Sequence, residues 1–354
     1  MNLHSNDPIY SQFHDEIVED LLYIIAKKIH TDDLFHLSNC NASLNCMIHH
    51  PPFIRNKLAS INSNMKCYIK KKRWNLALYN AAKHGHLDVC KYFVSLGATD
   101  FDRALCDAVI YGHLEICKYF VLFGATNFNG VLNIAVINGY LDICKYLVSL
   151  GAADFNSALE NAAEYGELDI CKYFVSLGAV NYDTALENAA INGELDICKY
   201  FVSLGATKYD TALKYAAKYG ELDICKYFVS LGATNFNSAL WTTALNGHLD
   251  ICKYLVSIGT FSIADYDTAL SGATRNGHLD ICKYLVSIGT FSIADYDTAL
   301  SGATRNGHLD ICKYLVSIGT FSIANYNTVL SDATIHRHLE IREYLESIST
   351  DKLN

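Results

Sequence analysis

The sequence predicts an all-α solenoid, a stack of short helix pairs around one continuous core, preceded by a small helical domain. Self-similarity at a fixed spacing indicates a repeat architecture. Here Gly-Glu-Leu-Asp-Ile-Cys-Lys-Tyr-Phe-Val-Ser-Leu-Gly runs over 166–178 and returns at 193–205 and 220–232. Variants extend the pattern to about ten units of 27 or 30 residues between Trp74 and Ser349. All three prolines precede residue 53, so one architecture fills the rest of the chain.

The first helix of a unit is expected at 184–192 in the fifth unit. Thr184 suits an N-cap, because its hydroxyl can accept a free backbone N–H of the first turn. Leu186, Ala189 and Ala190 then share one face at i, i+3, i+4 spacing. Gly193 ends the helix, as glycine does where the chain turns left-handed.

The second helix is expected at 195–204 and is closed by Gly205. Asp196 and Lys199 pair on its wet side, which contributes only a few tenths of a kcal/mol. Helices this short are marginal alone, so each must bury its apolar stripe against its neighbours. The expected stripe of this helix consists of Leu195, Cys198, Phe201 and Val202.

The unit Thr-Ala-Leu-x-x-Ala-Ala-x-x-Gly-Glu/His-Leu-Asp-Ile-Cys-Lys-Tyr-Leu-Val-Ser-Leu-Gly-Ala resembles the ankyrin repeat over residues 74–349. Ala185 stands where that family has proline, and the unit is shorter than the family's roughly 33 residues. The missing residues fall where the family has its β-hairpin, so we expect tight loops and little or no strand. The short, Cys-rich unit is similar to ankyrin arrays of giant amoeba-infecting viruses (mimivirus-like).

The last unit is expected to cap the array, since terminal repeats need a polar outer face. Residues 350–354 are then a C-terminal tail. The substitutions that mark this cap replace both glycines and the repeated cysteine and add acidic residues: Arg337, Arg342, Ser349, Glu343 and Glu346.

Residues 1–73 carry no repeat and are expected to form helices at about 17–29, 31–38 and 42–48. The run Ile17-Val18-Glu19-Asp20-Leu21-Leu22, followed by Ile25, Ile29, Asp33-Leu34 and Leu37-Ser38, resembles an F-box. The family's proline is replaced by Val18, and its later tryptophan is absent. The resemblance implies docking to the Skp-type adaptor of a cullin ubiquitin ligase; the alternative is a simple N-terminal cap. The implied docking residues are Leu21, Leu22, Ile25, Leu34 and Leu37.

Charge and hydropathy argue against two partner classes. Lys and Arg total 28 against 37 Asp and Glu, a net charge of −9, which disfavours nucleic-acid binding by the whole surface. The basic run Lys70–Arg73, with Lys66 nearby, is interpreted as a solvated junction, and the alternative is a nuclear address or a nucleic-acid patch. No apolar run approaches the roughly 18 residues of a membrane helix. Residues 1–10 do not resemble a signal peptide.

No catalytic motif is found, so the protein is not expected to be an enzyme or to need a cofactor. The spacing of Cys40, Cys46, His49 and His50 fits zinc poorly, and no metal site is expected. Reduced, buried thiols indicate the cytoplasm (of the host, if the protein is viral) or the nucleus. Nine of the 13 cysteines recur at one repeat position: Cys90, Cys117, Cys144, Cys171, Cys198, Cys225, Cys252, Cys282 and Cys312.

A histidine also recurs at one repeat position, as in His248. It is expected to bond loop backbone and not a metal, because equivalent positions lie a full repeat apart.

Function is expected at positions that vary among otherwise uniform units. Aromatic and cationic side chains are common hot spots of protein interfaces. The resemblance places them on the concave, first-helix face, where a target protein would bind without catalysis. The alternative is a plain scaffold or decoy. The candidate binding residues are Lys214, Tyr215, Lys218, Tyr219, Trp241, Tyr165 and Tyr111.

Overall fold

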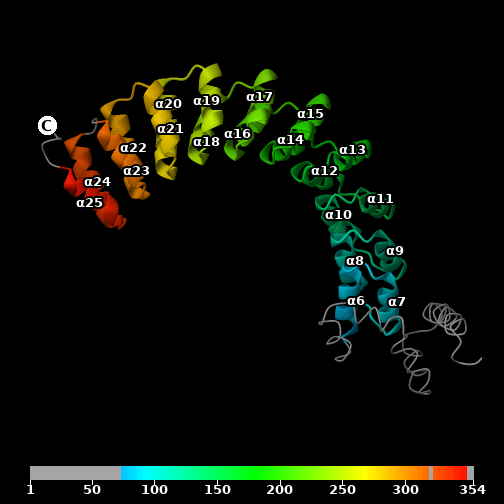
Figure 1. The fold of residues 1–354 in the computed structure, drawn as a ribbon. Coiled ribbons are helices and arrows are strands. Elements are labelled where there is room, and N and C mark those ends of the chain that lie inside the picture. Colours follow the sequence, from blue (N-terminus) through cyan, green and yellow to red (C-terminus); the bar gives the residue numbers. More distant parts are fainter. Residues whose placement is uncertain (1–72, 319–321, 349–354) are drawn as a thin grey trace, which may run out of the picture. The chain divides into compact units, whose positions relative to one another are not determined.

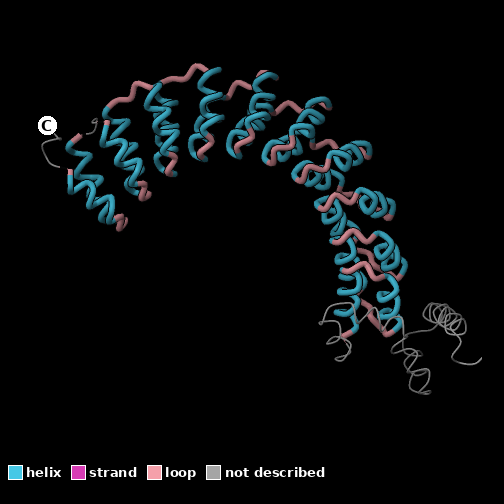
Figure 2. Tube along the Cα trace, in the orientation of Figure 1, coloured by secondary structure: helices cyan, strands magenta, loops and turns pink. Residues whose placement is uncertain are grey.

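The computed structural model describes residues 73–318 and 322–348. Within these ranges the chain forms ten successive helix pairs and no strand (Figures 1 and 2). The all-α fold and the absence of a β-hairpin are therefore confirmed for this part of the chain. The chain divides into two compact bodies, Met1–Ala158 and Leu159–Asn354, and the division falls inside a helix.

Each pair consists of a first and a second helix joined by a short turn. The first helices are α6 (Trp74–Lys83), α8 (Phe101–Ile110), α10 (Phe128–Ile137), α12 (Phe155–Glu164), α14 (Tyr182–Ile191), α16 (Tyr209–Tyr219), α18 (Phe236–Asn246), α20 (Ile263–Asn276), α22 (Ile293–Arg305) and α24 (Ile323–Ile335). The second helices are α7 (Leu87–Ser95), α9 (Leu114–Leu122), α11 (Leu141–Ser149), α13 (Leu168–Ser176), α15 (Leu195–Ser203), α17 (Leu222–Ser230), α19 (Leu249–Ile258), α21 (Leu279–Ile288), α23 (Leu309–Ser317) and α25 (Leu339–Ser347).

Within each body the first helices form a closely packed row. Consecutive first helices are in extensive contact, as between α16 and α18 or α20 and α22, whereas consecutive second helices barely touch. Small side chains at the contact, such as Ala189 and Ala190, are fully buried and let the first helices approach. The row of first helices therefore lies on the inner, concave side of each body.

The core of each unit is built from the expected repeat positions with one shift. In α14 the buried face contains Leu186, Ala189 and Ala190, as expected. In α15 the buried residues are Ile197, Cys198 and Phe201, whereas Leu195 and Val202 are only half-buried. The predicted stripe of the second helix was wrong at these two positions. Leu195 is the first residue of α15 and lies beside the turn, and the helix presents Ile197 to the core in its place.

An aromatic residue begins the first helix of the first seven units, a feature not predicted from the sequence. Tyr182 opens α14, and its ring stacks on Phe201 of the same unit at 6.2 Å between centroids. This contact draws two further residues into the helix. The predicted N-cap Thr184 is consequently wrong: the cap is Asn181, and Thr184 lies within the first turn.

In at least six units a carboxylate or amide next to an aromatic residue of the first helix ties the unit to the following one. Asp183 Oδ1 accepts hydrogen bonds from the backbone N–H groups of Thr207 at 2.7 Å and Lys208 at 3.2 Å. The loop that links two units thus has its free donors satisfied by the preceding first helix. The same side chain serves in other units at Asn75, Asp102, Asn129 and Asp210.

Gly193 follows α14 with φ of 83°, in the left-handed region that favours glycine. A Cβ there would lie 2.7 Å from a carboxylate oxygen of Glu221 in the next unit, so the Glu221 side chain would have to move to admit one. The last unit departs from this rule, since Arg337 adopts φ of 61°. Arg342 is solvent-exposed where other units bury cysteine, as expected of a cap. Ser349 and the tail lie outside the described residues.

The three extra residues of the eighth to tenth units lengthen the first helix. Ser262 caps α20, and its backbone N–H and hydroxyl both bond the Asp265 carboxylate. This capping box starts the helix about one turn earlier than in a 27-residue unit.

Candidate protein-binding surface

Five of the predicted binding residues lie on two adjacent first helices, α16 and α18. Lys214 and Lys218 are one turn apart on α16, and Trp241 occupies on α18 the position that Lys214 has on α16. Trp241 is 39% exposed, so a large aromatic side chain lies partly at the surface of α18. The structure therefore brings these residues to the inner face of one body.

A cation–π pair stands at the end of α16. The Lys218 ammonium lies 4.9 Å from the ring centroid of Tyr219, and its nitrogen is 3.4 Å from the phenol oxygen. The backbone carbonyl of Lys218 is in turn bonded by His248 Nε2 of the next unit at 2.9 Å. The His248 bond therefore holds the turn next to the pair in place, and the Tyr219 side chain is 46% exposed. Tyr215, the fifth residue, is half-buried between the other positions of α16.

The two remaining predicted tyrosines hold the position of Tyr219 in other units. Tyr165 is 49% exposed after α12, two units before Tyr219 in the same body. Tyr111 is 44% exposed after α8, in the other body, where the Lys83 ammonium lies 5.2 Å from its ring. The structure does not join Tyr111 or Tyr165 to the α16–α18 group.

The recurring histidine bonds loop backbone, as expected. Its Nε2 atom lies within hydrogen-bond distance of a carbonyl near the end of the preceding first helix. The ring also packs over the left-handed glycine of that unit, as His248 does over Gly220. Such bonds are seen for His113, His248, His278, His308 and His338.

The repeated cysteines are buried and form no disulfide. Burial raises the pKa of the Cys198 thiol to about 12, so at neutral pH the group is a protonated, apolar core residue. In the described part of the chain no three His, Cys, Asp or Glu side chains gather as a metal site requires. No helix there is long and apolar enough to span a membrane.

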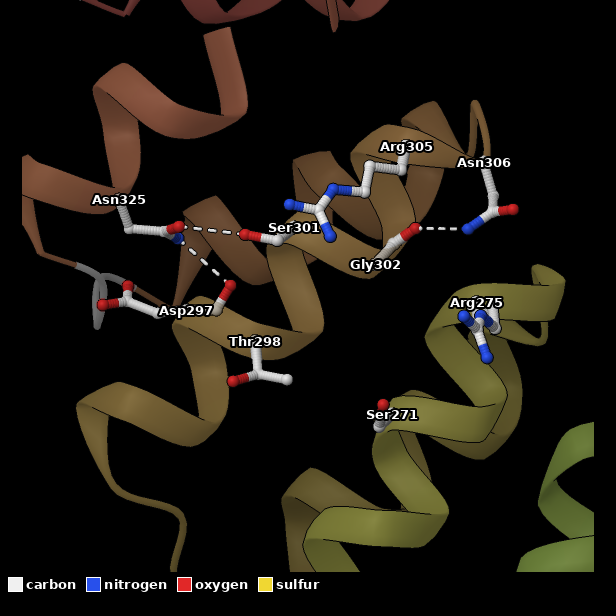
Figure 3. Close-up of a pocket in the computed structure, with 9 residues that line it drawn as sticks. All are labelled: Ser271, Arg275, Asp297, Thr298, Ser301, Gly302, Arg305, Asn306 and Asn325. Atoms are coloured by element: carbon white, nitrogen blue, oxygen red, sulfur yellow. Dashed lines mark hydrogen bonds between the residues drawn. The ribbon is translucent and has the colours of Figure 1, made fainter. Parts of the chain in front are cut away.

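A surface hollow of about 430 Å³ lies over α20, α22 and α24, and the sequence analysis did not single it out as a site. Figure 3 shows Ser271 and Arg275 on α20, opposite Ser301 and Arg305 on α22. The full lining consists of Ser271, Arg275, Asp297, Thr298, Ser301, Gly302, Arg305, Asn306 and Asn325.

Most polar groups at the α24 side of the hollow are already paired. Arg305 Nε donates to Asp332 Oδ2 at 2.8 Å. Asp297 accepts from the backbone N–H of Ser322 at 2.9 Å and from its hydroxyl at 2.7 Å. The Ser301 hydroxyl donates to Asn325 Oδ1 at 2.9 Å.

Comparison with known families agrees with this architecture. The family model described as ankyrin repeats (3 copies) matches the chain in five overlapping stretches, 78–158, 105–183, 132–212, 159–238 and 213–294. The chain belongs to the ankyrin-repeat family. No curated protein sequence matches it significantly.

Membership of the ankyrin family indicates the general role of the inner surface. Ankyrin arrays are generally non-catalytic scaffolds that bind protein partners, and the row of first helices offers such a surface. The matched stretches begin at residue 78. The F-box resemblance, the Cys40–His50 cluster and the basic run Lys70–Arg73 lie before them; apart from Arg73 they also lie outside the described residues.

Proposed function

We propose that the ankyrin array binds a target protein through the inner face of α16 and α18. The observation that carries the proposal is the exposure of Trp241 and Tyr219 beside Lys214 and Lys218 on that face. The buried positions of α16 repeat those of α14, and α18 buries Thr242 in addition. None of the four side chains is among the buried residues of its helix, so core packing does not explain them. Aromatic and cationic residues on a rigid support have the composition of an interface hot spot.

The support is rigid because α16 and α18 pack closely, His248 holds the turn after α16, and Asp210 holds the loop that leads into α18. Asp210 of α16 accepts the backbone N–H groups of Thr234 and Asn235 at 2.7 and 2.9 Å. The side chains of the group therefore need little ordering when a partner binds, and the free energy lost to ordering is correspondingly small.

The test is affinity capture from eukaryotic cytosol with the full chain, followed by binding measurements on the protein captured. Replacing both Trp241 and Tyr219 by alanine is expected to weaken binding by roughly 30-fold or more, since a hot-spot residue contributes about 2 kcal/mol. The matched control is Lys226→Ala, an exposed residue of the second helix α17 in the same region. Equal binding by the double variant and the control would refute the proposal.

We further propose a division into residues 1–73, the array 74–349 and a tail 350–354, with the first part recruiting a ubiquitin ligase. Support comes from the F-box resemblance around Leu21, Leu22, Ile25, Leu34 and Leu37. In the capture experiment, Skp-type adaptor and cullin should be retained by the parent chain and lost with Leu34→Ala/Leu37→Ala. If neither protein is captured while the target still binds, residues 1–73 are only a cap and the array is a plain scaffold or decoy.

The resemblance of the short unit to giant-virus arrays supports a host protein as the target, in the host cytoplasm or nucleus. Capture from amoebal cytosol beside a mammalian extract tests this refinement. A target found only in the mammalian extract would contradict it.

A further inference from the structure

We infer that the hollow between α20 and α22 binds a carboxylate side chain of an extended acidic peptide, held by Arg275 and Ser271. This inference rests on the proposed function only in treating the array as a peptide-binding surface. It uses a different place on the molecule from the α16–α18 group, and the experiment below separates the two.

Two units of identical sequence lie in different surroundings. Residues 260–289 and 290–319 have the same sequence, so Arg275 and Arg305 have the same local sequence context. Their next units differ. Arg305 pairs with Asp332 of the tenth unit at 2.8 Å, whereas the residue that holds the place of Asp332 opposite Arg275 is Gly302. Arg275 consequently makes no ion pair among the described residues.

The serine one turn before each arginine shows the same difference between the two units. Ser301 donates its hydroxyl to Asn325 of the tenth unit. At the preceding junction Asp295 stands in place of Asn325, and its carboxylate is occupied by the backbone N–H of Ser292 at 2.7 Å. The Ser271 hydroxyl has no hydrogen-bond partner in the described part of the chain. Two donors on one face of α20 are therefore left without acceptors.

The tenth unit shows which chemistry satisfies these donors. At the junction of α22 and α24 a carboxylate and an amide oxygen meet the arginine and the serine. A carboxylate from outside can take the corresponding place over α20, because Gly302 leaves that space open. A Cβ built on Gly302 would meet only Thr274 Oγ1, at 3.4 Å. Guanidinium and carboxylate form strong, geometrically specific hydrogen bonds.

The other charges at the hollow do not oppose such a ligand strongly. The Asp297 carboxylate accepts two hydrogen bonds from Ser322, and Asp332 is paired with Arg305. Asn306 bonds the backbone carbonyl of Gly302 at 2.9 Å, which leaves its own carbonyl oxygen available for a peptide N–H. The hollow of about 430 Å³ is large enough for a few residues of extended peptide.

The test uses a fluorescein-labelled peptide of alternating serine and glutamate, with a serine–glutamine peptide of equal length as the uncharged probe. Binding to the full chain is measured by fluorescence anisotropy near physiological ionic strength, where distant charges are screened. Gly302→Asp places a carboxylate beside Arg275 as Asp332 does beside Arg305, and is expected to weaken serine–glutamate binding about tenfold or more. Gly302→Asn adds the same bulk without charge and should retain most of the binding.

Two controls complete the design. Asn237→Asp adds one negative charge to α18 at a position where α16 has Asp210, and should leave binding unchanged. Trp241→Ala should also leave it unchanged, so failure of the α16–α18 proposal does not affect this result. Equal binding of the two peptides by the parent chain, or equal weakening by Gly302→Asp and Gly302→Asn, would overturn the inference.

Discussion

Phe201→Ala is the substitution that tests most directly how the array is held together. Phe201 is fully buried, and its ring stacks on Tyr182 at the start of the same unit. Truncating such a side chain removes its transfer free energy and leaves a cavity, at a cost of about 3–5 kcal/mol. Because a repeat array is stabilised by nearest-neighbour contacts, the loss should be concentrated in the fifth unit and its two junctions.

The chain supplies its own control for this experiment. Half of the units carry leucine at the same position, so Phe201→Leu should cost less than about 1.5 kcal/mol. These leucines are Leu147, Leu255, Leu285, Leu315 and Leu345.

The assay is urea denaturation of the full chain followed by far-UV circular dichroism. The parent chain and Phe201→Leu should unfold with similar midpoints. Phe201→Ala should lower the midpoint clearly and broaden or split the transition, since the segments on either side of the fifth unit are then weakly coupled. A midpoint for Phe201→Ala that equals that of Phe201→Leu would refute the role given to this packing.

Three further predictions follow from the same features. Asp183→Ala leaves the N–H groups of Thr207 and Lys208 without their acceptor and should cost about 1–2 kcal/mol by thermal melting, whereas Asp183→Asn should cost much less. Equal melting temperatures of the two variants would contradict the role given to Asp183 in holding the linking loop. Burial raises the pKa of the Cys198 thiol from 9.0 to about 12. The contribution of Cys198 to the free energy of unfolding should therefore be complete below pH 9 and fall as the pH rises further, by up to about 1.4 kcal/mol per pH unit. Urea midpoints at pH 8, 9 and 10 should fall less steeply for Cys198→Ala than for the parent chain, and parallel curves would contradict the prediction. Arg337→Gly relieves the positive φ of 61° and should raise the melting temperature through a gain of about 1 kcal/mol; a decrease would indicate that the arginine side chain stabilises the cap.

The architecture could be predicted from the sequence because the repeat spacing, the glycines and the small residues determine where helices end and how closely they pack. Gly193 and the Ala189–Ala190 pair give the helix end and the close helix contact directly. The first residue of each helix was harder to predict. Thr184 has a good capping side chain, but the stacking of Tyr182 on Phe201 extends the helix past it, and that contact becomes visible only when the two helices are packed.

Some residues of the candidate sites could likewise be predicted from the sequence, and others become visible only in the packed structure. Exposed Trp241 and Tyr219 could be predicted because variation against a uniform background is visible in a sequence. Asp183 has a constant offset in the repeat and could have been found by aligning the units, yet its partners lie in the next linking loop. The contrast between Arg275 and Arg305 depends on which residue faces each guanidinium across a junction, and only the packed structure pairs Arg305 with Asp332.

The identity of the eighth and ninth units has an evolutionary consequence. Two copies of one segment expose different chemistry here, because each junction is completed by the unit that follows. A duplication therefore changes more than the length of the array. By placing a glycine-bearing copy beside the older arginine, it can open a new ligand site without a single point mutation, and a later change at Gly302 to an acidic residue can close that site again.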